Sequence, residues 1–315
     1  MNYAILGIMP FLIVYIFIPI LRKIFLKIGF TDKPTDRKKH NNPKPLCGGI
    51  GIYVGFFITY SIFLHDKEEQ FNWIFIASTL ILGIGLVDDY YKSKGKEFPI
   101  YPRLIVQLTA AFIVYKSGIV FEGFTSPFNG TYIVLPTIIQ FILTMTWIFG
   151  VTTVINWSDG MDGLAGGLSI ISALTFFVAA LILGQEVSAM TSIILAGAIF
   201  GFWIYNKYPA TVFMGDSGAN FIGFILSIIA LDGAFKQATV LSVFIPILAL
   251  AVPIFDNIFV VLKRFFSGKP VYQADRSQMH YRLEQKGLKT KECVNYILMI
   301  SLICSLISII ILLLN

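Results

Sequence analysis

Apolar residues occur along this chain in long runs that short polar segments separate. A run of about 17 to 25 residues is the length that an α-helix needs to cross a bilayer. Ten runs can be read, at 3–21, 48–64, 71–87, 100–119, 136–155, 163–183, 187–205, 217–231, 238–262 and 294–314. The eighth is short for a straight span, and residues 120–136 are apolar enough for an extra partial segment. The pattern therefore predicts an all-α, polytopic integral membrane protein with about ten transmembrane helices.

The composition agrees with this class. Of the 315 residues, 56% are hydrophobic and 13% are charged, and the mean hydropathy is +0.77, whereas soluble domains carry about 25% charged residues. The longest loops hold only about 30 residues, so we expect one transmembrane domain over residues 1–315. The first run has no basic residue before it, Arg22 and Lys23 just after it and no small-residue cleavage site, so it is expected to remain as an anchor.

Lysine and arginine are concentrated on one side of the predicted membrane. Loops 22–47 and 263–291 carry eight each, and this side holds 21 of the 24 in total. Short loops rich in these residues stay in the cytoplasm, so we predict that both termini face outward and that the basic face is cytoplasmic. The net charge of +6 would attract anionic headgroups and phosphorylated ligands, although the same charges would be present if they served only to fix the topology.

The cysteines indicate no special chemistry. Cys47, Cys293 and Cys304 form no CxxC pair and no pair on the outer side, so we predict neither a disulfide nor a zinc site. No Walker loop or dinucleotide-binding glycine pattern occurs between a strand and a helix, and we expect no nucleic-acid partner.

Acidic residues mark the predicted cytoplasmic ends of three spans, in "GLVDDYYK", "NWSDGMDG" and "NKYPATVFMGDSG". Asp88 and Asp89 lie at a helix C-terminus, where the helix dipole is already negative, so their placement is unfavourable unless a cation compensates. Asp159 and Asp162 are three residues apart, which points both the same way on a helical turn. Asp216 lies in a glycine-flanked turn just before the eighth span.

Either Asp159 or Asp216 alone could simply cap the following helix. Five carboxylates on one face of a membrane bundle favour a functional site, because ionisable groups at membrane level are costly. Oxygen ligands without a histidine or cysteine cluster suit Mg²⁺ or Mn²⁺ and not zinc. Magnesium usually bridges carboxylates and phosphates, so the sequence indicates phosphoryl chemistry on a lipid substrate at the cytoplasmic surface.

Six motifs, in this order, resemble the polyprenyl-phosphate N-acetylhexosamine-1-phosphate transferases, glycosyltransferase family 4. They are "DRKKHNNPKPLCGG" (36–49), "GLVDDYY" (85–91), "NWSDGMDGLAGG" (156–167), "NKYPATVFMGDSG" (206–218), "PIFDN" (253–257) and "ADRSQMHYRL" (274–283). The resemblance covers nearly the whole chain. Within the family, the His-x-x-Pro-x-Pro-x-x-Gly-Gly pattern at 40–49 is similar to the bacterial undecaprenyl-phosphate GlcNAc-1-phosphate transferases, which begin teichoic acid, O-antigen or related glycan synthesis.

The resemblance implies a Mg²⁺-dependent reaction at the bacterial cytoplasmic membrane. The oxygen of undecaprenyl phosphate would attack the β-phosphorus of UDP-GlcNAc, giving undecaprenyl-diphosphate-GlcNAc and UMP. A direct attack and a covalent aspartyl-phosphate both remain open, although direct displacement is simpler because phosphoryl transfer needs mainly positioning and charge neutralisation. Membrane lipids are further expected partners, and a homodimer stays open.

Motif matches imply roles for individual residues. Asp216 and Asp88 would hold the metal, and Asp88 or Asp89 could act as a base at the lipid phosphate. The implied catalytic residues are Asp88, Asp89, Asp159, Asp216 and His280, and the implied substrate-binding residues are Asn156, Asp162, Asn206, Phe213, Arg103 and Arg282. Asp162 and Phe213 would lie at the uracil, Arg103 near the phosphates, and His280 and Arg282 at the diphosphate, where arginine offers a charged fork.

The sixth motif departs from the family pattern. The GlcNAc branch usually reads His-x-His-His-Arg, whereas this chain has Gln278 and Tyr281 around the retained His280 and Arg282. The exact sugar nucleotide is therefore open, with phospho-MurNAc-pentapeptide transferase or another UDP-HexNAc-1-phosphate transferase as the alternative. Asp256, near the end of the ninth run, could be scaffold or site.

A cation-coupled transporter is an alternative from a different class, because transporters also use acidic residues and interrupted helices. Against it, the acidic residues cluster at one surface instead of the midplane, and the outward loops carry no matching set. We therefore expect an enzyme.

Overall fold

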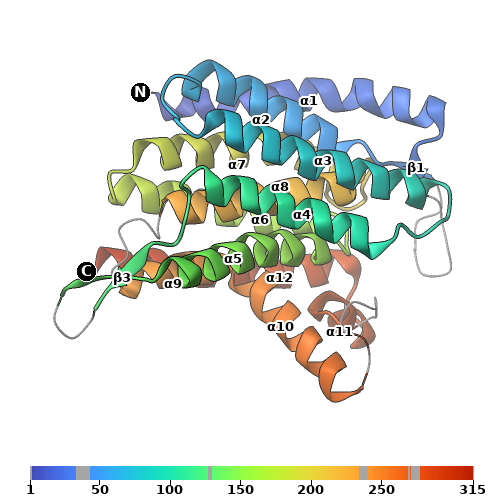
Figure 1. Cartoon of the computed structure of the whole chain (residues 1–315). Coiled ribbons are helices and arrows are strands. Elements are labelled where there is room, and N and C mark those ends of the chain that lie inside the picture. Colours follow the sequence, from blue (N-terminus) through green and yellow to red (C-terminus); the bar gives the residue numbers. More distant parts are fainter. Residues whose placement is uncertain are drawn as a thin grey trace.

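The computed structural model describes residues 2–32, 43–126, 130–233, 240–268, 270 and 277–314. The helices are α1 (Tyr3–Ile28), α2 (Gly48–Leu64), α3 (Phe71–Ser93), α4 (Ile100–Lys116), α5 (Thr137–Trp157), α6 (Leu164–Ile182), α7 (Glu186–Asn206), α8 (Gly215–Asp232), α9 (Val240–Ala249), α10 (Ala251–Phe266), α11 (Met279–Gln285) and α12 (Thr290–Leu313). Short antiparallel ribbons, β1 (Thr31–Asp32) with β2 (Lys44–Pro45) and β3 (Gly123–Thr125) with β4 (Tyr132–Val134), lie at opposite ends of the molecule (Figure 1). The all-α prediction is confirmed.

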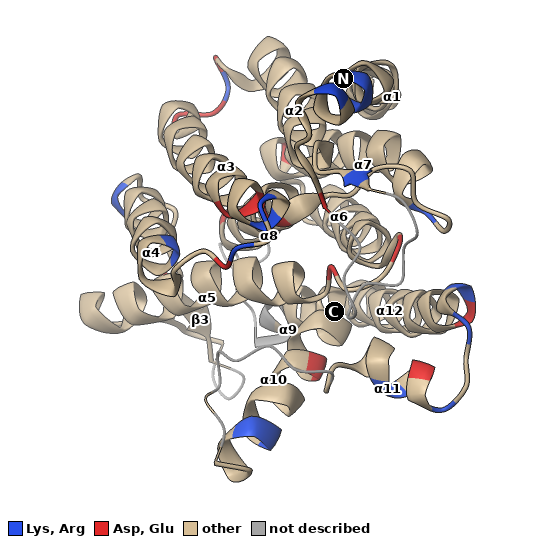
Figure 2. Cartoon of the chain, turned by 90° about the vertical axis from the view of Figure 1, so that its right-hand side faces the viewer, with Lys and Arg blue, Asp and Glu red and all other residues tan. Residues whose placement is uncertain are grey.

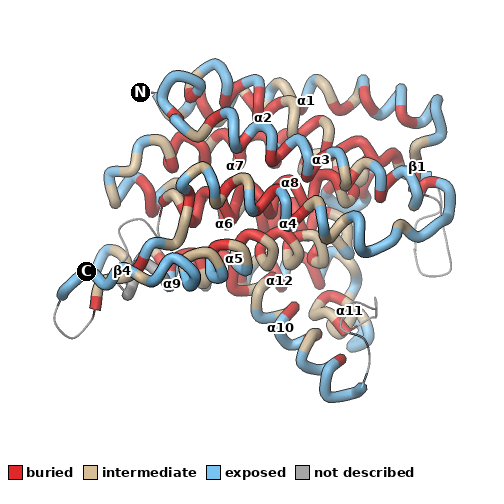
Figure 3. Tube along the Cα trace, in the orientation of Figure 1, coloured by how far each residue is buried: buried red, intermediate tan, exposed pale blue. Residues whose placement is uncertain are grey.

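Helix α8 forms the centre of the bundle. Every residue of α8 from Ser217 to Leu231 is buried, and the helix packs against α2, α3 and α5. On one side α1 packs on α7, and α7 packs on α6. Figure 3 shows the buried positions running through the middle of the bundle, while exposed positions follow the outer faces of its peripheral helices.

Glycines allow α2 and α3 to contact the backbone at the start of α8. A Cβ on Gly49 would lie 2.4 Å from the backbone nitrogen of Gly218, and a Cβ on Gly85 would lie 2.4 Å from the Cα of Ser217. Larger side chains would force these backbones apart. The contact holds the N-terminus of α8 against the last turns of α3, which carry Asp88 and Asp89.

The outer surface of the bundle is apolar. Large apolar side chains are exposed along the peripheral helices, including Ile16 on α1, Ile138 on α5 and Leu306 on α12. In the described part of the chain, six helices are long and apolar enough to cross a membrane, namely α1, α3, α5, α6, α7 and α12, and α2 is a shorter apolar helix. An apolar surface of this extent is suited to lipid and not to water. The chain is a multi-helix membrane protein.

The ninth predicted span is not a single helix. α9 ends at Ala249 and α10 begins at Ala251, with Leu250 at φ −109° and ψ 18° between them. Pro253 lacks the N–H that a continuous helix would donate, and its ring crowds the preceding turn. The prediction of one helix over 238–262 is therefore wrong, and α10 leaves the bundle at an angle (Figure 1). The count of ten spans stays a prediction.

Parts of two motifs lie outside the described residues, namely 36–42 of the first and 274–276 of the sixth, as do Lys236 and several basic residues of loops 22–47 and 263–291. The three cysteines are unpaired.

Candidate active site

One end of the bundle contains a pocket of about 390 Å³ that collects most of the predicted site residues. Its lining includes Asp89, Asp159, Asp162, Asn206, Phe213 and Asp216, together with Asp32, Lys92, Tyr281 and Glu284. Figure 2 views the molecule from this end, where acidic positions near the ends of α3, α6 and α8 lie toward the middle. The structure thus brings together side chains from segments that are far apart in the sequence.

Asp89 ties α3 to the N-terminus of α8. Its Oδ1 accepts the backbone N–H of Asp216 at 2.7 Å, and its Oδ2 accepts the backbone N–H and the hydroxyl of Ser217 at 3.1 and 2.7 Å. The carboxylate thereby satisfies N–H groups that a helix leaves free at its N-terminus. Asp89 is 0% exposed. Both of its oxygens are already occupied, so its position favours a structural role that sets where Asp216 lies.

Gly215 makes this arrangement possible. Its φ is +76°, which disfavours any residue with a side chain, and a Cβ there would lie 2.4 Å from Asp89 Oδ2. The glycine before Asp216 in "MGDSG" is therefore required by both the backbone turn and the neighbouring carboxylate.

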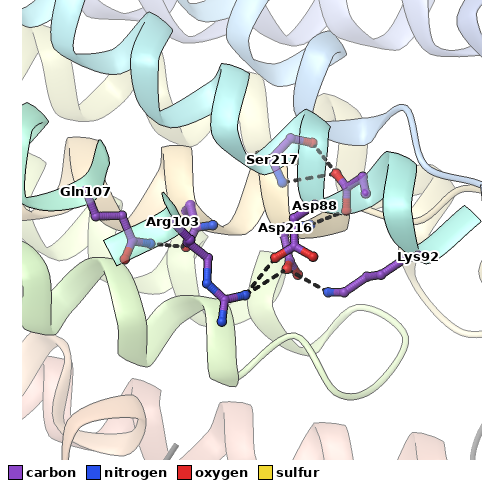
Figure 4. Close-up of polar contacts among 8 residues, drawn as sticks. Asp88, Lys92, Arg103, Gln107, Asp216 and Ser217 are labelled. Atoms are coloured by element: carbon purple, nitrogen blue, oxygen red, sulfur yellow. Dashed lines mark hydrogen bonds and ion pairs between the residues drawn. The ribbon is translucent and has the colours of Figure 1, made fainter. Parts of the chain in front are cut away.

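Four charged side chains form a compact cluster beside Asp89 (Figure 4). Arg103 Nη1, from α4, lies 2.6 Å from Asp88 Oδ2 and 3.7 Å from Asp216 Oδ2. Lys92 Nζ, one turn after Asp88 on α3, lies 2.6 Å from the same Asp216 oxygen. The two carboxylates therefore face each other between a guanidinium on one side and an ammonium on the other. This cluster unites the predicted metal ligands with the predicted phosphate-binding arginine.

Asp88 and Asp216 are the residues that fit a divalent cation. They bring oxygen donors together from two helices, and oxygen is the ligand that Mg²⁺ prefers. No group of three or more His, Cys, Asp or Glu side chains is arranged as a ready metal cage within the described part of the chain. A Mg²⁺ ion held here would take its remaining ligands from phosphate and water, as is usual for this metal.

Asn206 joins two loops of the pocket. Its Oδ1 accepts the backbone N–H of Gly163 at 3.1 Å, and its Nδ2 donates to the carbonyl of Val212 at 3.0 Å. Asp162 Oδ2 links the same loops by accepting the backbone N–H of Ala210 at 2.8 Å. Asn206 and Asp162 are both predicted to bind substrate, and both line the pocket. The hydrogen bonds given above run to backbone groups, so they hold the two loops in place.

Phe213 lies where the second loop meets β2. Its backbone N–H donates to the carbonyl of Pro45 at 3.0 Å, and its carbonyl accepts the N–H of Gly48 at 3.1 Å. These bonds hold Phe213 in the pocket wall. Asn156 is not among the residues that line the pocket, and its Nδ2 is buried with no hydrogen-bond partner among the described residues.

Asp159 lies in the loop between α5 and α6 and is partly buried. Burial and the nearby Asp216 carboxylate raise its pKa to about 7. The carboxylate would therefore exchange a proton near neutral pH, which distinguishes it from an ordinary surface aspartate.

His280 is buried behind the pocket and does not line it. Its exposed fraction is 2%, and a Cβ on Gly160 would lie 2.2 Å from its Nε2. Burial lowers its pKa to about 4, so the ring is neutral at pH 7. The histidine is thus placed to support the loop that carries Asp159 and Asp162. Its predicted contact with the diphosphate stays a prediction.

Arg282 is held away from the pocket by Asp256. Its Nη2 donates to Asp256 Oδ1 at 2.7 Å, and its guanidinium carbon lies 4.3 Å from the centre of the Phe259 ring. The Asp256 oxygens also accept the backbone N–H of Met279 at 2.9 and 2.8 Å. Asp256 therefore docks α11 on α10, and the α11 residues that line the pocket are Tyr281 and Glu284.

The lining also includes residues that are not among the predicted site residues, such as Asp32, Lys92, Tyr281 and Glu284. Lys92 has a signal in the sequence, since it is four residues after Asp88 and on a helix therefore shares its face. Tyr281 stands out in the sequence only as a departure from the family motif. Asp32 and Glu284 have no comparable signal.

Comparison with known proteins identifies the family of this chain. The profile described as "Glycosyl transferase family 4" matches residues 71–234. A Bacillus subtilis protein named "Probable undecaprenyl-phosphate N-acetylglucosaminyl 1-phosphate transferase" is 35% identical over 303 residues, which is 96% of this chain and 83% of the relative. A "Decaprenyl-phosphate N-acetylglucosaminephosphotransferase" of Mycolicibacterium smegmatis is 28% identical, covering 92% and 77%.

The "Undecaprenyl-phosphate alpha-N-acetylglucosaminyl 1-phosphate transferase" of Escherichia coli (strain K12) is 26% identical, covering 90% of this chain and 76% of the relative. The matched region includes Asp88, Asp89, Asp159, Asp162 and Asp216, five of the carboxylates that the pocket and its adjoining cluster bring together. The chain belongs to glycosyl transferase family 4.

Proposed function

We propose that this membrane protein transfers GlcNAc-1-phosphate from UDP-GlcNAc to undecaprenyl phosphate, giving undecaprenyl-diphosphate-GlcNAc and UMP. The observation that carries the proposal is the convergence of Asp88 and Asp216 beside Arg103, at a polar pocket in an otherwise apolar bundle. Relatives named for GlcNAc-1-phosphate transfer to polyprenyl phosphate, which align with most of the chain, support the donor and the acceptor.

The chemistry would be a direct displacement. An oxygen of the acceptor phosphate forms a bond to the β-phosphorus of the donor, and the bond from that phosphorus to the bridging oxygen breaks, so that UMP leaves with this oxygen. Mg²⁺ or Mn²⁺, when bound, supplies charge neutralisation for the diphosphate. Direct transfer needs positioning and electrostatic stabilisation more than a covalent intermediate.

The residues would divide this work. Asp216, fixed by Asp89, and Asp88, fixed by Arg103, hold the metal. The guanidinium of Arg103 offers its remaining N–H groups to phosphate oxygens. Asp162 and Phe213 lie in the same wall and would bind the nucleotide.

The pocket would face the cytoplasm, where the nucleotide sugar is made, with both termini outside. This orientation rests on the concentration of lysine and arginine on one side, 21 of 24. The ten-span arrangement in the bacterial cytoplasmic membrane is part of the same proposal.

The test is UMP release by the purified protein in detergent with undecaprenyl phosphate, Mg²⁺ and a panel of UDP-GlcNAc, UDP-GalNAc, UDP-diacetylated sugars and UDP-MurNAc-pentapeptide. We expect UDP-GlcNAc to be the best donor and omission of the lipid to stop the reaction. Preference for the pentapeptide nucleotide would contradict the proposed donor. Absence of UMP with every donor would contradict the enzyme and favour the transporter alternative.

A further inference from the structure

Lys92 pairs with the Asp216 carboxylate, the group at which a metal would bind. Lys92 Nζ lies 2.6 Å from Asp216 Oδ2, the same oxygen that Arg103 Nη1 approaches at 3.7 Å. The Lys92 side chain is 39% exposed and lines the pocket, whereas the Asp216 side chain is 14% exposed. Figure 4 shows the lysine reaching the carboxylate from the side opposite to Arg103.

Lysine and metal cannot both occupy this position. Mg²⁺ binds carboxylate oxygens at about 2.0–2.1 Å, and an ammonium in contact with the same oxygen would then lie within a few ångströms of a doubly charged ion. Coulomb repulsion between them at about 4 Å is roughly 2 kcal/mol even in bulk water, and larger in a partly buried site. Metal binding at Asp216 therefore requires Lys92 to move.

Lys92 is better suited to move than Arg103. The guanidinium is also bound to Asp88 Oδ2 at 2.6 Å, so it has a second anchor within the cluster. The described ion pair of Lys92 is with Asp216, and its ammonium is a point charge on a flexible stem of four carbons. When the ammonium leaves Asp216, this stem can swing within the pocket that Lys92 already lines.

We propose that Lys92 is a surrogate cation for the metal. It neutralises Asp216 while no metal is bound, is displaced when Mg²⁺ binds the carboxylate, and then contacts the diphosphate of the donor. The first two steps concern the metal alone, and the last step rests on the proposed function. Lys92 is thus a positioning residue before metal binding and a phosphate contact after it.

The test compares Lys92→Met with Lys94→Met, a matched control two residues further along. Lys94 lies over the Tyr90 ring at 5.4 Å and is not in the described wall of the pocket. Mn²⁺ binding to each purified variant is measured by electron paramagnetic resonance without nucleotide or lipid. Because a competing charge is removed, Lys92→Met should bind Mn²⁺ about tenfold more tightly than the unaltered protein or more, and Lys94→Met should bind it equally well. Equal or weaker binding by Lys92→Met would overturn the proposal.

A second measurement uses the unaltered protein and does not depend on a variant folding. Lysine residues are labelled with an amine-acylating reagent, and the modified positions are quantified by mass spectrometry. Labelling of Lys92 relative to Lys94 should increase when Mg²⁺ is added and decrease again when UDP-GlcNAc follows. No change with Mg²⁺ would overturn displacement of the lysine. An increase with Mg²⁺ that UDP-GlcNAc does not reverse would overturn the phosphate contact.

These outcomes separate the inference from the proposed function. Mn²⁺ affinity and Mg²⁺-dependent labelling are measured without turnover, so they report on Lys92 even if no donor releases UMP. Failure of the donor panel with tighter Mn²⁺ binding by Lys92→Met would contradict the enzyme and leave metal competition in place.

Discussion

The backbone N–H of Asp216 donates to Asp89 Oδ1 at 2.7 Å, although 127 positions separate the two residues along the chain. This bond and the two from Ser217 fix the first turn of α8 on the last turns of α3. The adjacent Asp88 faces Arg103 instead. Neighbouring aspartates thus have different roles, because successive side chains point in different directions around a helix.

Asp89→Ala should destabilise the protein as well as inactivate it. Three donors at the start of α8 would lose their buried acceptor, and each such loss costs about 1–3 kcal/mol. We expect a lower midpoint of thermal unfolding in detergent than for Asp88→Ala, which removes no acceptor from α8. Equal midpoints for the two variants would contradict the structural role of Asp89.

Asp216→Asn should abolish turnover while the protein stays folded. The amide keeps the size of the side chain and the backbone N–H that Asp89 accepts, but it removes the charge needed to hold Mg²⁺. We expect UMP release to fall at least about a hundredfold with an unchanged elution profile in gel filtration. Full activity of the unaltered protein in EDTA would contradict the metal requirement on which this prediction rests.

Asp159 should make stability depend on pH in the absence of metal. Its pKa is raised from 3.8 to about 7 by burial and by Asp216, so the folded protein binds a proton that the unfolded chain releases. Ionised Asp159 therefore disfavours folding, and stability should fall as the pH rises from about 4 to 7 and level off above 7.

The corresponding measurement is thermal unfolding in EDTA of the unaltered protein and Asp159→Asn. The difference in thermal midpoint, Asp159→Asn minus the unaltered protein, should grow between pH 5 and pH 7 and then stay constant. A constant difference between the two proteins across this range would show that Asp159 has an ordinary pKa.

Gly160→Ala should disturb the pocket through His280. The added methyl group would lie 2.2 Å from the ring nitrogen, so either the loop or the histidine must shift. We expect activity to fall at least about tenfold, and His280→Ala to restore part of it in the double variant, since neighbouring changes are not additive. A double variant less active than Gly160→Ala would indicate that His280 contacts substrate directly.

Arg282→Ala and Asp256→Asn should have coupled effects. If Arg282 acts through Asp256, to which it donates at 2.7 Å, the double variant should have nearly the same KM for UDP-GlcNAc as the more affected single variant. If the arginine instead binds the diphosphate, the increases in KM for UDP-GlcNAc from the two single variants should multiply in the double variant. Arg282→Ala alone should then weaken donor use about tenfold to a hundredfold.

Much of the site could be predicted from the sequence because its chemistry lies in local motifs. Carboxylates at the helix ends of a membrane protein are costly unless they serve a function, so the sequence predicts Asp159, Asp162 and Asp216 on one surface, and the pocket contains all three. The different roles of Asp88 and Asp89 depend on which neighbouring helix each side chain faces, and adjacent positions in a sequence do not contain that information.

Two further differences between the sequence-based predictions and the structure also have physical causes. Hydropathy measures only apolar length, so the run at 238–262 looks continuous although Pro253 lies just after the break between α9 and α10. The family motif implies that His280 lies at the diphosphate, and the structure adds that burial against Gly160 makes the ring neutral at pH 7. Burial of a loop residue depends on tertiary packing, which a single sequence does not reveal.

The two hydrogen bonds that Asn206 makes, to Gly163 and to Val212, also bear on the thermodynamics of recognition. Two loops that already share buried hydrogen bonds need little ordering when a ligand enters, so little conformational entropy is lost there. Calorimetry of donor binding would then show a heat-capacity change that matches the apolar area covered, without the larger change that accompanies coupled folding. The pocket is, in this sense, assembled before its ligand arrives.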